Sequence, residues 1–195
     1  MKSAFPEKIE YSDISLLPAG HFEGRIFLLE TPQAARKAAL HLQSTYTVLG
    51  FDTETKPSFK KGKKNNVSLL QLASANEAFL FRLNMCGFIP ELAHLLADTS
   101  IKKIGVAVHD DIKHLCNLRP FTPAAFIDLQ SYAKQFGILD CGLKKITAIV
   151  LGINISKSQR LTNWETRQLS PQQLIYAATD AWVCHRIYHR LNNDE

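Results

Sequence analysis

The stretch Val48-Leu-Gly-Phe-Asp52-Thr-Glu54-Thr55 is an apolar run that ends in two carboxylates, one residue apart. In a β-strand, side chains two residues apart point to the same face, so Asp52 and Glu54 are expected side by side next to apolar neighbours. Two like charges on a partly buried strand are costly unless they share a proton or a divalent cation neutralises them. The alternative is a strand end with solvated acids, and this spacing alone leaves both interpretations open.

The composition is that of one globular domain. The chain has 195 residues, of which 46% are hydrophobic and 21% charged, so a full core can be buried. Its formal net charge of +5 is compatible with a polyanionic partner. The first residues lack the apolar core of a signal peptide, and no apolar run has the length of a membrane span. We therefore expect a soluble protein of the cytoplasm, without a membrane partner, whose four widely spaced cysteines are reduced packing thiols.

The pattern predicts an α/β domain over residues 25–195, with residues 1–24 as a lead-in that packs on it. Besides the opening strand, strands are expected at residues 25–30, 67–73, 78–83 and 101–108, the second and third of which form a hairpin. Helices are expected at residues 31–42, shortly after Pro90, and at 111–116, 128–136, 143–151 and 170–191. A strand-rich first half and a helix-rich second half around a central sheet indicate the α/β class.

Two further acidic motifs follow later in the chain. The apolar strand predicted at 101–108 is followed by Asp110 and Asp111. In the last predicted helix Tyr176 and Asp180 are four residues apart and share a face, although a tyrosine bonded to its own helix is the structural alternative. Carboxylates converging from separate elements are what a pair of Mg²⁺ or Mn²⁺ ions requires in a phosphoryl-transfer site.

In this order the motifs Phe51-Asp-Thr-Glu54, Gly105-Val-Ala-Val-His-Asp-Asp111-Ile and Tyr176-Ala-Ala-Thr-Asp180 resemble the three exonuclease motifs of the DEDD superfamily of 3′→5′ exonucleases. The chain is most similar to the tyrosine-containing (DEDDy) branch, with the Werner syndrome exonuclease domain and ribonuclease D. The histidine branch carries its general base five residues before the last aspartate, where this chain has Ile175. The resemblance spans roughly residues 25–191 and implies a ribonuclease H-like fold, a central mixed β-sheet flanked by helices.

The resemblance also implies a site. Asp52, Glu54, Asp111 and Asp180 would be catalytic ligands of two divalent cations, Mg²⁺ or Mn²⁺, and Tyr176 would orient the attacking water. The reaction would be hydrolysis of terminal phosphodiester bonds at single-stranded or recessed 3′ ends of DNA or RNA, with release of nucleoside 5′-monophosphates. Alignment of the second motif with the family favours Asp111 as the ligand, which leaves Asp110 to cap the helix or to support the ligands.

A lysine-rich segment at residues 56–64 follows the first acidic strand. Positive charge beside a cleavage site provides affinity for phosphates, whereas a solvated loop is the alternative. We expect substrate contacts from this segment and from Arg160, with base stacking by the one aromatic residue in the segment, so the candidate residues are Phe59, Lys60, Lys61, Lys63, Lys64 and Arg160. Trp164 is expected in the core.

Two other functions are compatible with the same residues. One is a two-metal phosphodiesterase that acts on short oligonucleotides or dinucleotides. The other is a non-catalytic nucleic-acid-binding module that keeps the fold without the chemistry. The basic segment favours polymers, and the complete set of acids with Tyr176 favours catalysis. No residue distinguishes DNA from RNA or indicates a protein partner.

Overall fold

The computed structural model describes residues 5–58 and 65–192 and contains a six-stranded sheet of order β1-β4-β3-β2-β5-β6. The strands are β1 Arg25–Leu29, β2 Val48–Thr55, β3 Val67–Ala73, β4 Glu77–Arg82, β5 Lys102–Gly105 and β6 Phe126–Asp128. β3 is antiparallel to both of its neighbours, β2 and β4, whereas the other neighbouring pairs are parallel. The stretch that ends in two carboxylates is therefore a central strand, β2, of a mixed sheet, as expected.

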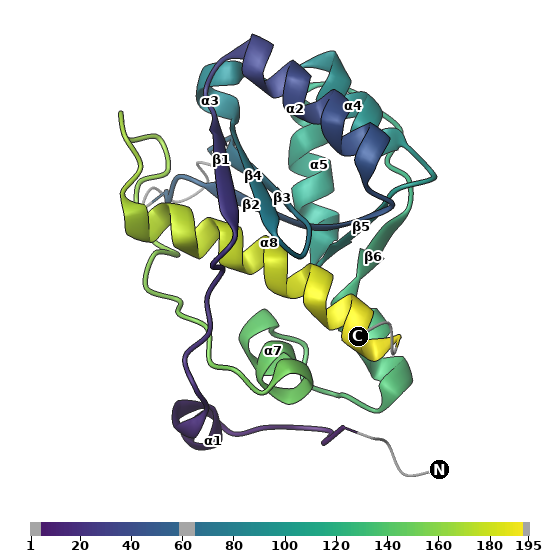
Figure 1. Ribbon diagram of the computed structural model, residues 1–195, viewed down its shortest axis with the longest axis vertical. Helices are drawn as coiled ribbons and strands as arrows, with labels where there is room; N and C mark the ends of the chain where they lie inside the picture. Colours follow the sequence, from purple (N-terminus) through teal and green to yellow (C-terminus); the bar gives the residue numbers. More distant parts are fainter. Residues whose placement is uncertain (1–4, 59–64, 193–195) are drawn as a thin grey trace.

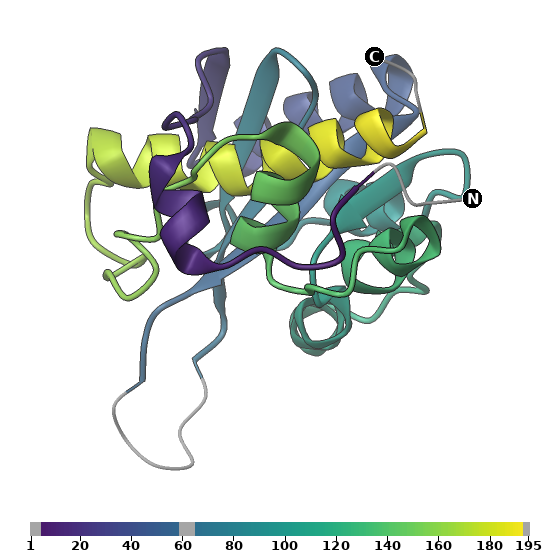
Figure 2. The same cartoon turned by 90° about the horizontal axis from the view of Figure 1, so that it is seen from below.

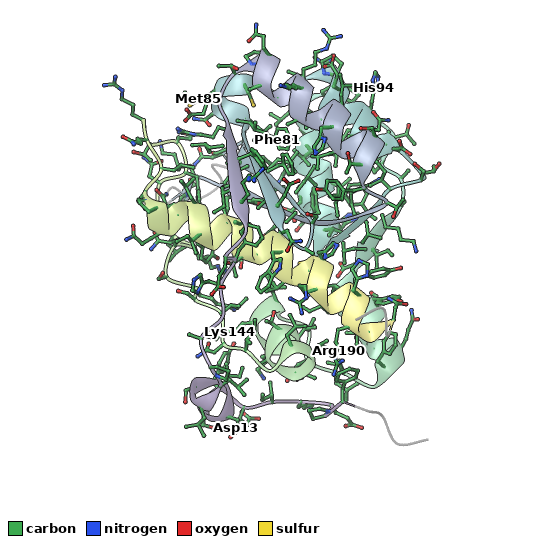
Figure 3. The ribbon with its side chains drawn as sticks, viewed as in Figure 1. Asp13, Phe81, Met85, His94, Lys144 and Arg190 are labelled. Carbon is green, nitrogen blue, oxygen red and sulfur yellow. The ribbon has the colours of Figure 1, made fainter. Side chains whose placement is uncertain are left out.

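Helices cover both faces of this sheet (Figure 1). They are α1 Tyr11–Leu16, α2 Pro32–Thr45, α3 Leu83–Cys86, α4 Pro90–Ala97, α5 Val108–Leu118, α6 Leu129–Tyr132, α7 Leu143–Leu151 and α8 Pro171–Leu191, with a 3₁₀ turn at Ala133–Phe136. The face packed against α2 and α4 is buried in one apolar cluster, and Figure 3 shows Phe81 of β4 within it. The long helix α8 crosses the opposite face against β2 and β3, and Figure 2 shows α7 beside it.

The contact between α8 and the sheet depends on Gly50 in the middle of β2. A Cβ atom at this position would lie 1.8 Å from the backbone oxygen of Ala181 in α8. Because any side chain here would separate the two elements, the glycine lets the helix backbone approach the strand directly. Gly50, Asp52 and Glu54 alternate along β2 and share the face toward α8, so this close approach brings α8 to the acidic end of the strand.

The starts of α2 and α8 agree with the sequence, which predicted helices beginning at Thr31 and Ser170, whereas α2 continues to Thr45, three residues past its predicted end. α8 begins with a capping box, in which the Ser170 side chain accepts from the Gln173 backbone and the Gln173 side chain accepts from the Ser170 backbone. The Thr31 side chain caps α2 by accepting from the backbone N–H of Ala34. α7 has the predicted bounds. Local capping chemistry therefore marks the start of α2 and of α8, the helix that carries Tyr176 and Asp180.

The expected strand 101–108 is wrong at its end. β5 stops at Gly105, Ala107 has a left-handed backbone with φ 56°, and α5 begins at Val108. Continuous apolar residues do not distinguish a buried strand from the first turn of a buried helix, and Val108 is buried as a helix residue. Asp110 and Asp111 therefore lie in the first turn of a helix and not at a strand end.

Some smaller elements also differ from expectation. The predicted helix 128–136 is present as α6 followed by the 3₁₀ turn, and its expected first residue, Asp128, is the N-cap at the end of the unpredicted strand β6. Helices α1 and α3 were not predicted either. All four cysteines are free thiols, two of them buried and Cys141 exposed. Within the two described ranges, no helix is both long enough and apolar enough to span a bilayer.

Candidate active site

Three carboxylates meet where α8 crosses the acidic end of β2. Asp52, Glu54 and Asp180 each offer an oxygen, and these oxygens lie within 4.8 Å of one another. Asp52 and Glu54 share a face of the strand as their spacing predicts, and Asp180, which is 6% exposed, reaches them from the helix above Gly50. The structure thus brings together residues 128 positions apart in the sequence, from Asp52 to Asp180.

Burial and mutual repulsion hold protons on this cluster. Burial, together with the charges of Asp180 and Asp111, raises the pKa of Glu54 to about 9. Burial raises the pKa of Asp180 to about 7, and burial with the neighbouring carboxylates raises the pKa of Asp52 well above its ordinary value. Oxygen ligands crowded in this way are what a hard divalent cation binds, and such a cation would replace the protons. The donor set therefore fits the expected metal.

Tyr176 lies one helical turn before Asp180 and is 9% exposed. Its hydroxyl is hydrogen-bonded to the Asp180 carboxylate, and burial and the neighbouring acids raise the pKa of Tyr176 above its ordinary value. The phenol is therefore protonated throughout the neutral range and acts as a hydrogen-bond donor, not as a base. The structural alternative of a tyrosine bonded to its own helix is present, and it places the hydroxyl at the acidic cluster.

Asp111 approaches the cluster from α5. Its carboxylate is not among the three whose oxygens lie within 4.8 Å of one another. β5 pairs with β2 only as far as Gly50, and α5 lies beside the strand beyond that point. There the Asp111 carboxylate accepts a hydrogen bond from the Thr53 hydroxyl, and its charge raises the pKa of Asp52 and Glu54. Its own pKa is raised, mainly by burial.

The adjacent carboxylate, Asp110, is exposed and is not part of the three-carboxylate cluster. The expectation that it caps the helix is wrong, because the N-cap of α5 is Ala107 and no side chain caps this end. The reason is that the helix begins two residues before Asp110, so this residue lies inside the first turn. An acid in the first turn still interacts favourably with the helix dipole.

Two cations face the acidic cluster from the loop between α7 and α8. Arg160 is exposed, and its charge lowers the pKa of Glu54. The charge of Lys157 likewise lowers the pKa of Asp180. Lys157 was not predicted from the sequence. Its only signal was its position three residues before Arg160 in one loop. Trp164, four residues after Arg160, is fully buried as expected. Part of the expected substrate contacts, Phe59, Lys60, Lys61, Lys63 and Lys64, lies outside the described residues.

A mixed sheet with an acidic cluster between its central strand and a crossing helix defines a nuclease of the ribonuclease H-like class. The chain belongs to the 3′-5′ exonuclease family, whose model matches residues 27–194. The recognition of the family from three short motifs is thereby confirmed, as is the expectation of a hydrolase of the nuclease type.

Curated relatives carry the same description. The chain is 38% identical over 154 residues to exonuclease 3′-5′ domain-containing protein 2 of Drosophila melanogaster, covering 77% of this chain and 26% of that protein. It is 34% identical to the bifunctional 3′-5′ exonuclease/ATP-dependent helicase WRN of Mus musculus, covering 75% of this chain and 11% of that protein. A 3′-5′ exonuclease of Arabidopsis thaliana is 30% identical over 191 residues, covering 90% of this chain and 66% of that protein. The chain thus matches only part of each relative.

Solved structures establish the fold. The Nibbler EXO domain of Aedes aegypti superposes with a TM-score of 0.79 at 24% identity, covering 90% of this chain and 92% of that one. Ribonuclease D of Escherichia coli superposes with a TM-score of 0.77 at 23% identity, covering 87% of this chain and 45% of that one. The expected ribonuclease H-like fold is therefore confirmed.

Proposed function

We propose that this chain is a metal-dependent 3′→5′ exonuclease that removes terminal nucleotides from DNA or RNA as nucleoside 5′-monophosphates. The observation that carries the proposal is the group of three carboxylates, with oxygens within 4.8 Å of one another, beside the hydroxyl of Tyr176. Family membership supports the reaction class, and the basic character of the chain supports a polyanionic substrate.

Asp52, Glu54 and Asp180 are the residues that would hold a divalent cation, Mg²⁺ or Mn²⁺. Asp111 would complete the ligands of a second ion, because it lies next to Thr53 of β2 with its charge directed at Asp52 and Glu54. Bound cations would supply an activated water and neutralise charge on the scissile phosphodiester. The raised pKa values indicate that the carboxylates lose their protons when the ions bind.

The remaining residues hold and orient the substrate. Tyr176 donates its one O–H to Asp180, and its oxygen would accept a hydrogen bond from the attacking water, which would fix the direction from which water approaches the terminal phosphorus. Lys157 and Arg160 provide positive charge on the substrate side, where backbone phosphates are bound without regard to sequence. The lysines of residues 60–64 and Phe59 would extend this surface along a single-stranded or recessed 3′ end.

The proposal is tested by a time course on 5′-labelled single-stranded DNA, recessed duplex DNA and RNA in Mg²⁺, Mn²⁺ or EDTA. We expect a ladder that shortens from the 3′ end, requires the cation, and disappears in Asp52→Ala. Asp13→Ala is the matched control, since this acid lies on α1 away from the site (Figure 3), and it should degrade like the wild type. Intact polymers together with cleavage of dinucleotides would favour a phosphodiesterase of short substrates instead. Binding without any cleavage would favour a non-catalytic module.

A further inference from the structure

The loop between α7 and α8, residues 152–170, places a fully buried tryptophan against the candidate catalytic tyrosine. The Trp164 side chain is 0% exposed, and its ring centroid lies 6.0 Å from that of Tyr176 with the planes inclined by 36°. Leu69 of β3, Leu80 of β4 and Leu169 complete the apolar cluster around the two rings. Trp164 therefore forms part of the wall that surrounds the ring of Tyr176.

The loop is tied to the first turn of α8 by the side chain of Gln173. This side chain accepts from the backbone N–H of Ser170 at 3.0 Å and donates to Thr162 Oγ1 at 3.0 Å and to the Asn163 carbonyl at 3.3 Å. Gln173 is 5% exposed and lies one turn before Tyr176. The residues immediately before Trp164 are thus fixed to the helix that carries the tyrosine.

A buried arginine holds the loop on the other side of Trp164. Arg82, at the end of β4, is 1% exposed and donates to the Arg167 carbonyl at 3.0 Å and also to the Thr166 carbonyl. It pairs with Glu30 at 2.8 Å, so its buried charge is compensated. Trp164 therefore lies between two anchored segments, and its ring has little freedom to move.

We propose that Trp164 is a positioning residue that keeps the Tyr176 hydroxyl directed at the acidic cluster, an inference that rests on the proposed function. The hydroxyl is at the far end of a side chain that rotates about two bonds, so contacts along its ring decide where it lies. A displacement of about 1 Å at a catalytic group can cost about 100-fold in rate. Trp164 thus acts on turnover through the tyrosine, without touching the substrate.

The first test makes the same substitution, tryptophan to leucine, at two positions and compares the kcat values of the two variants. Trp164→Leu should lower kcat at least about 10-fold while KM and the cation requirement change little, because the acids and cations of the site remain. Trp182→Leu is the matched control, since Trp182 packs 6.1 Å from Phe22 at a later turn of α8. Its kcat should stay within about two-fold of the wild type, because Trp182 is not part of the cluster around Tyr176. An equal loss of kcat in both variants would overturn the inference.

The second test asks whether Trp164 acts through Tyr176. In a double-mutant cycle, Tyr176→Phe removes the hydroxyl, and adding Trp164→Leu should then cause almost no further loss of kcat. Losses that multiply would show that Trp164 acts elsewhere and would overturn the inference, whereas the exonuclease assignment would stand. An inactive wild type would overturn both.

Trp164→Phe completes the design. The indole N–H has no acceptor among the residues that the structure describes, so phenylalanine keeps an aromatic wall without loss of a hydrogen bond within those ranges. We expect this variant to retain more kcat than Trp164→Leu, with the same lack of additivity. If Trp164→Leu does not fold by circular dichroism, the cycle is run with Trp164→Phe, and multiplying losses there count equally against the inference.

Discussion

At Asp52 and Glu54, burial and the neighbouring carboxylates both raise the pKa, and burial raises the pKa of Asp180. The cluster is therefore a source of instability wherever these residues are ionised without a cation. Function and stability oppose each other at the same atoms, because the arrangement that would bind a metal is the one that the empty fold tolerates least. The consequence is measurable as a dependence of stability on pH.

In EDTA, the free energy of unfolding should fall as pH rises from about 5 to about 9. The pKa of Glu54 is raised from 4.5 to about 9 and that of Asp180 from 3.8 to about 7, so in this window the folded chain keeps protons that the unfolded chain has released. Stability from these groups is complete below their unfolded pKa values and is lost as pH passes their folded values. Urea unfolding at pH 5, 7 and 9 measures this directly.

Two comparisons isolate the cluster. Glu54→Gln should flatten the decline, whereas Glu23→Gln, an exposed residue in the segment before β1, should leave it unchanged. Mg²⁺ or Mn²⁺ should restore stability most at high pH in the wild type and little in Asp52→Asn. If Glu54→Gln and the wild type have the same dependence on pH, the raised pKa of Glu54 has no part in it.

The residues of the site differ in how far the sequence alone predicts them. Asp52 with Glu54, and Tyr176 with Asp180, were predictable because strand and helix periods place each pair on one face. Asp111 required the family resemblance, because nothing local separates it from Asp110. Lys157 and the hydrogen bonds that Arg82 donates to the loop between α7 and α8 were not predicted, since both depend on contacts between segments far apart in the chain.

At the scale of elements, the site depends on how closely α8 approaches β2. Gly50→Ala places a methyl group against backbone atoms of α8, which cannot move aside as a flexible side chain can. We expect a loss of stability of about 3 kcal/mol, in the upper part of the range for overpacking, together with a marked loss of nuclease activity as Asp180 withdraws from Asp52. Thermal unfolding and the oligonucleotide assay measure the two effects.

Gly142→Ala is the matched control for this prediction. Gly142 has φ −83°, and a Cβ atom there meets nothing within 4 Å. Its substitution should cost less than about 1 kcal/mol, the cost of a poorer N-cap, and should leave activity intact. Equal effects of the two substitutions would show that close packing at Gly50 does not hold the site together.

The helices and strands also differ in how far the sequence alone predicts them. α7 and α8 were predicted with nearly their true bounds because Pro171, the capping serine and the apolar period are all local signals. The end of β5 was not predicted correctly. The chain turns into α5 at Ala107, which has a left-handed backbone although it is neither glycine nor asparagine, the residues that usually signal this conformation. The three-residue β6 exists only through its pairing with β5.

At the scale of the whole molecule, the chain has a net charge of +5 although its candidate site is an acidic cluster. Binding of an oligonucleotide in EDTA should therefore weaken steeply with salt. Replacing both Lys157 and Arg160 by alanine should reduce the slope of log Kd against log salt by about 1.4 for single strands, if each contacts one phosphate. Fluorescence anisotropy of a 5′-labelled strand gives the slope. Replacing Lys37 and Lys134, exposed cations on α2 and in the 3₁₀ turn, should leave the slope nearly unchanged.

The environment of Trp164 gives this chain a built-in optical reporter. The sequence contains two tryptophans, and only Trp164 lies against Tyr176. In a Trp182→Phe background, indole emission therefore comes from one point beside the site. Its intensity and wavelength should change when a cation or a 3′ end enters, and excitation of the neighbouring phenol should pass to the indole by resonance energy transfer. Occupancy of the site can then be followed in real time without attaching a dye.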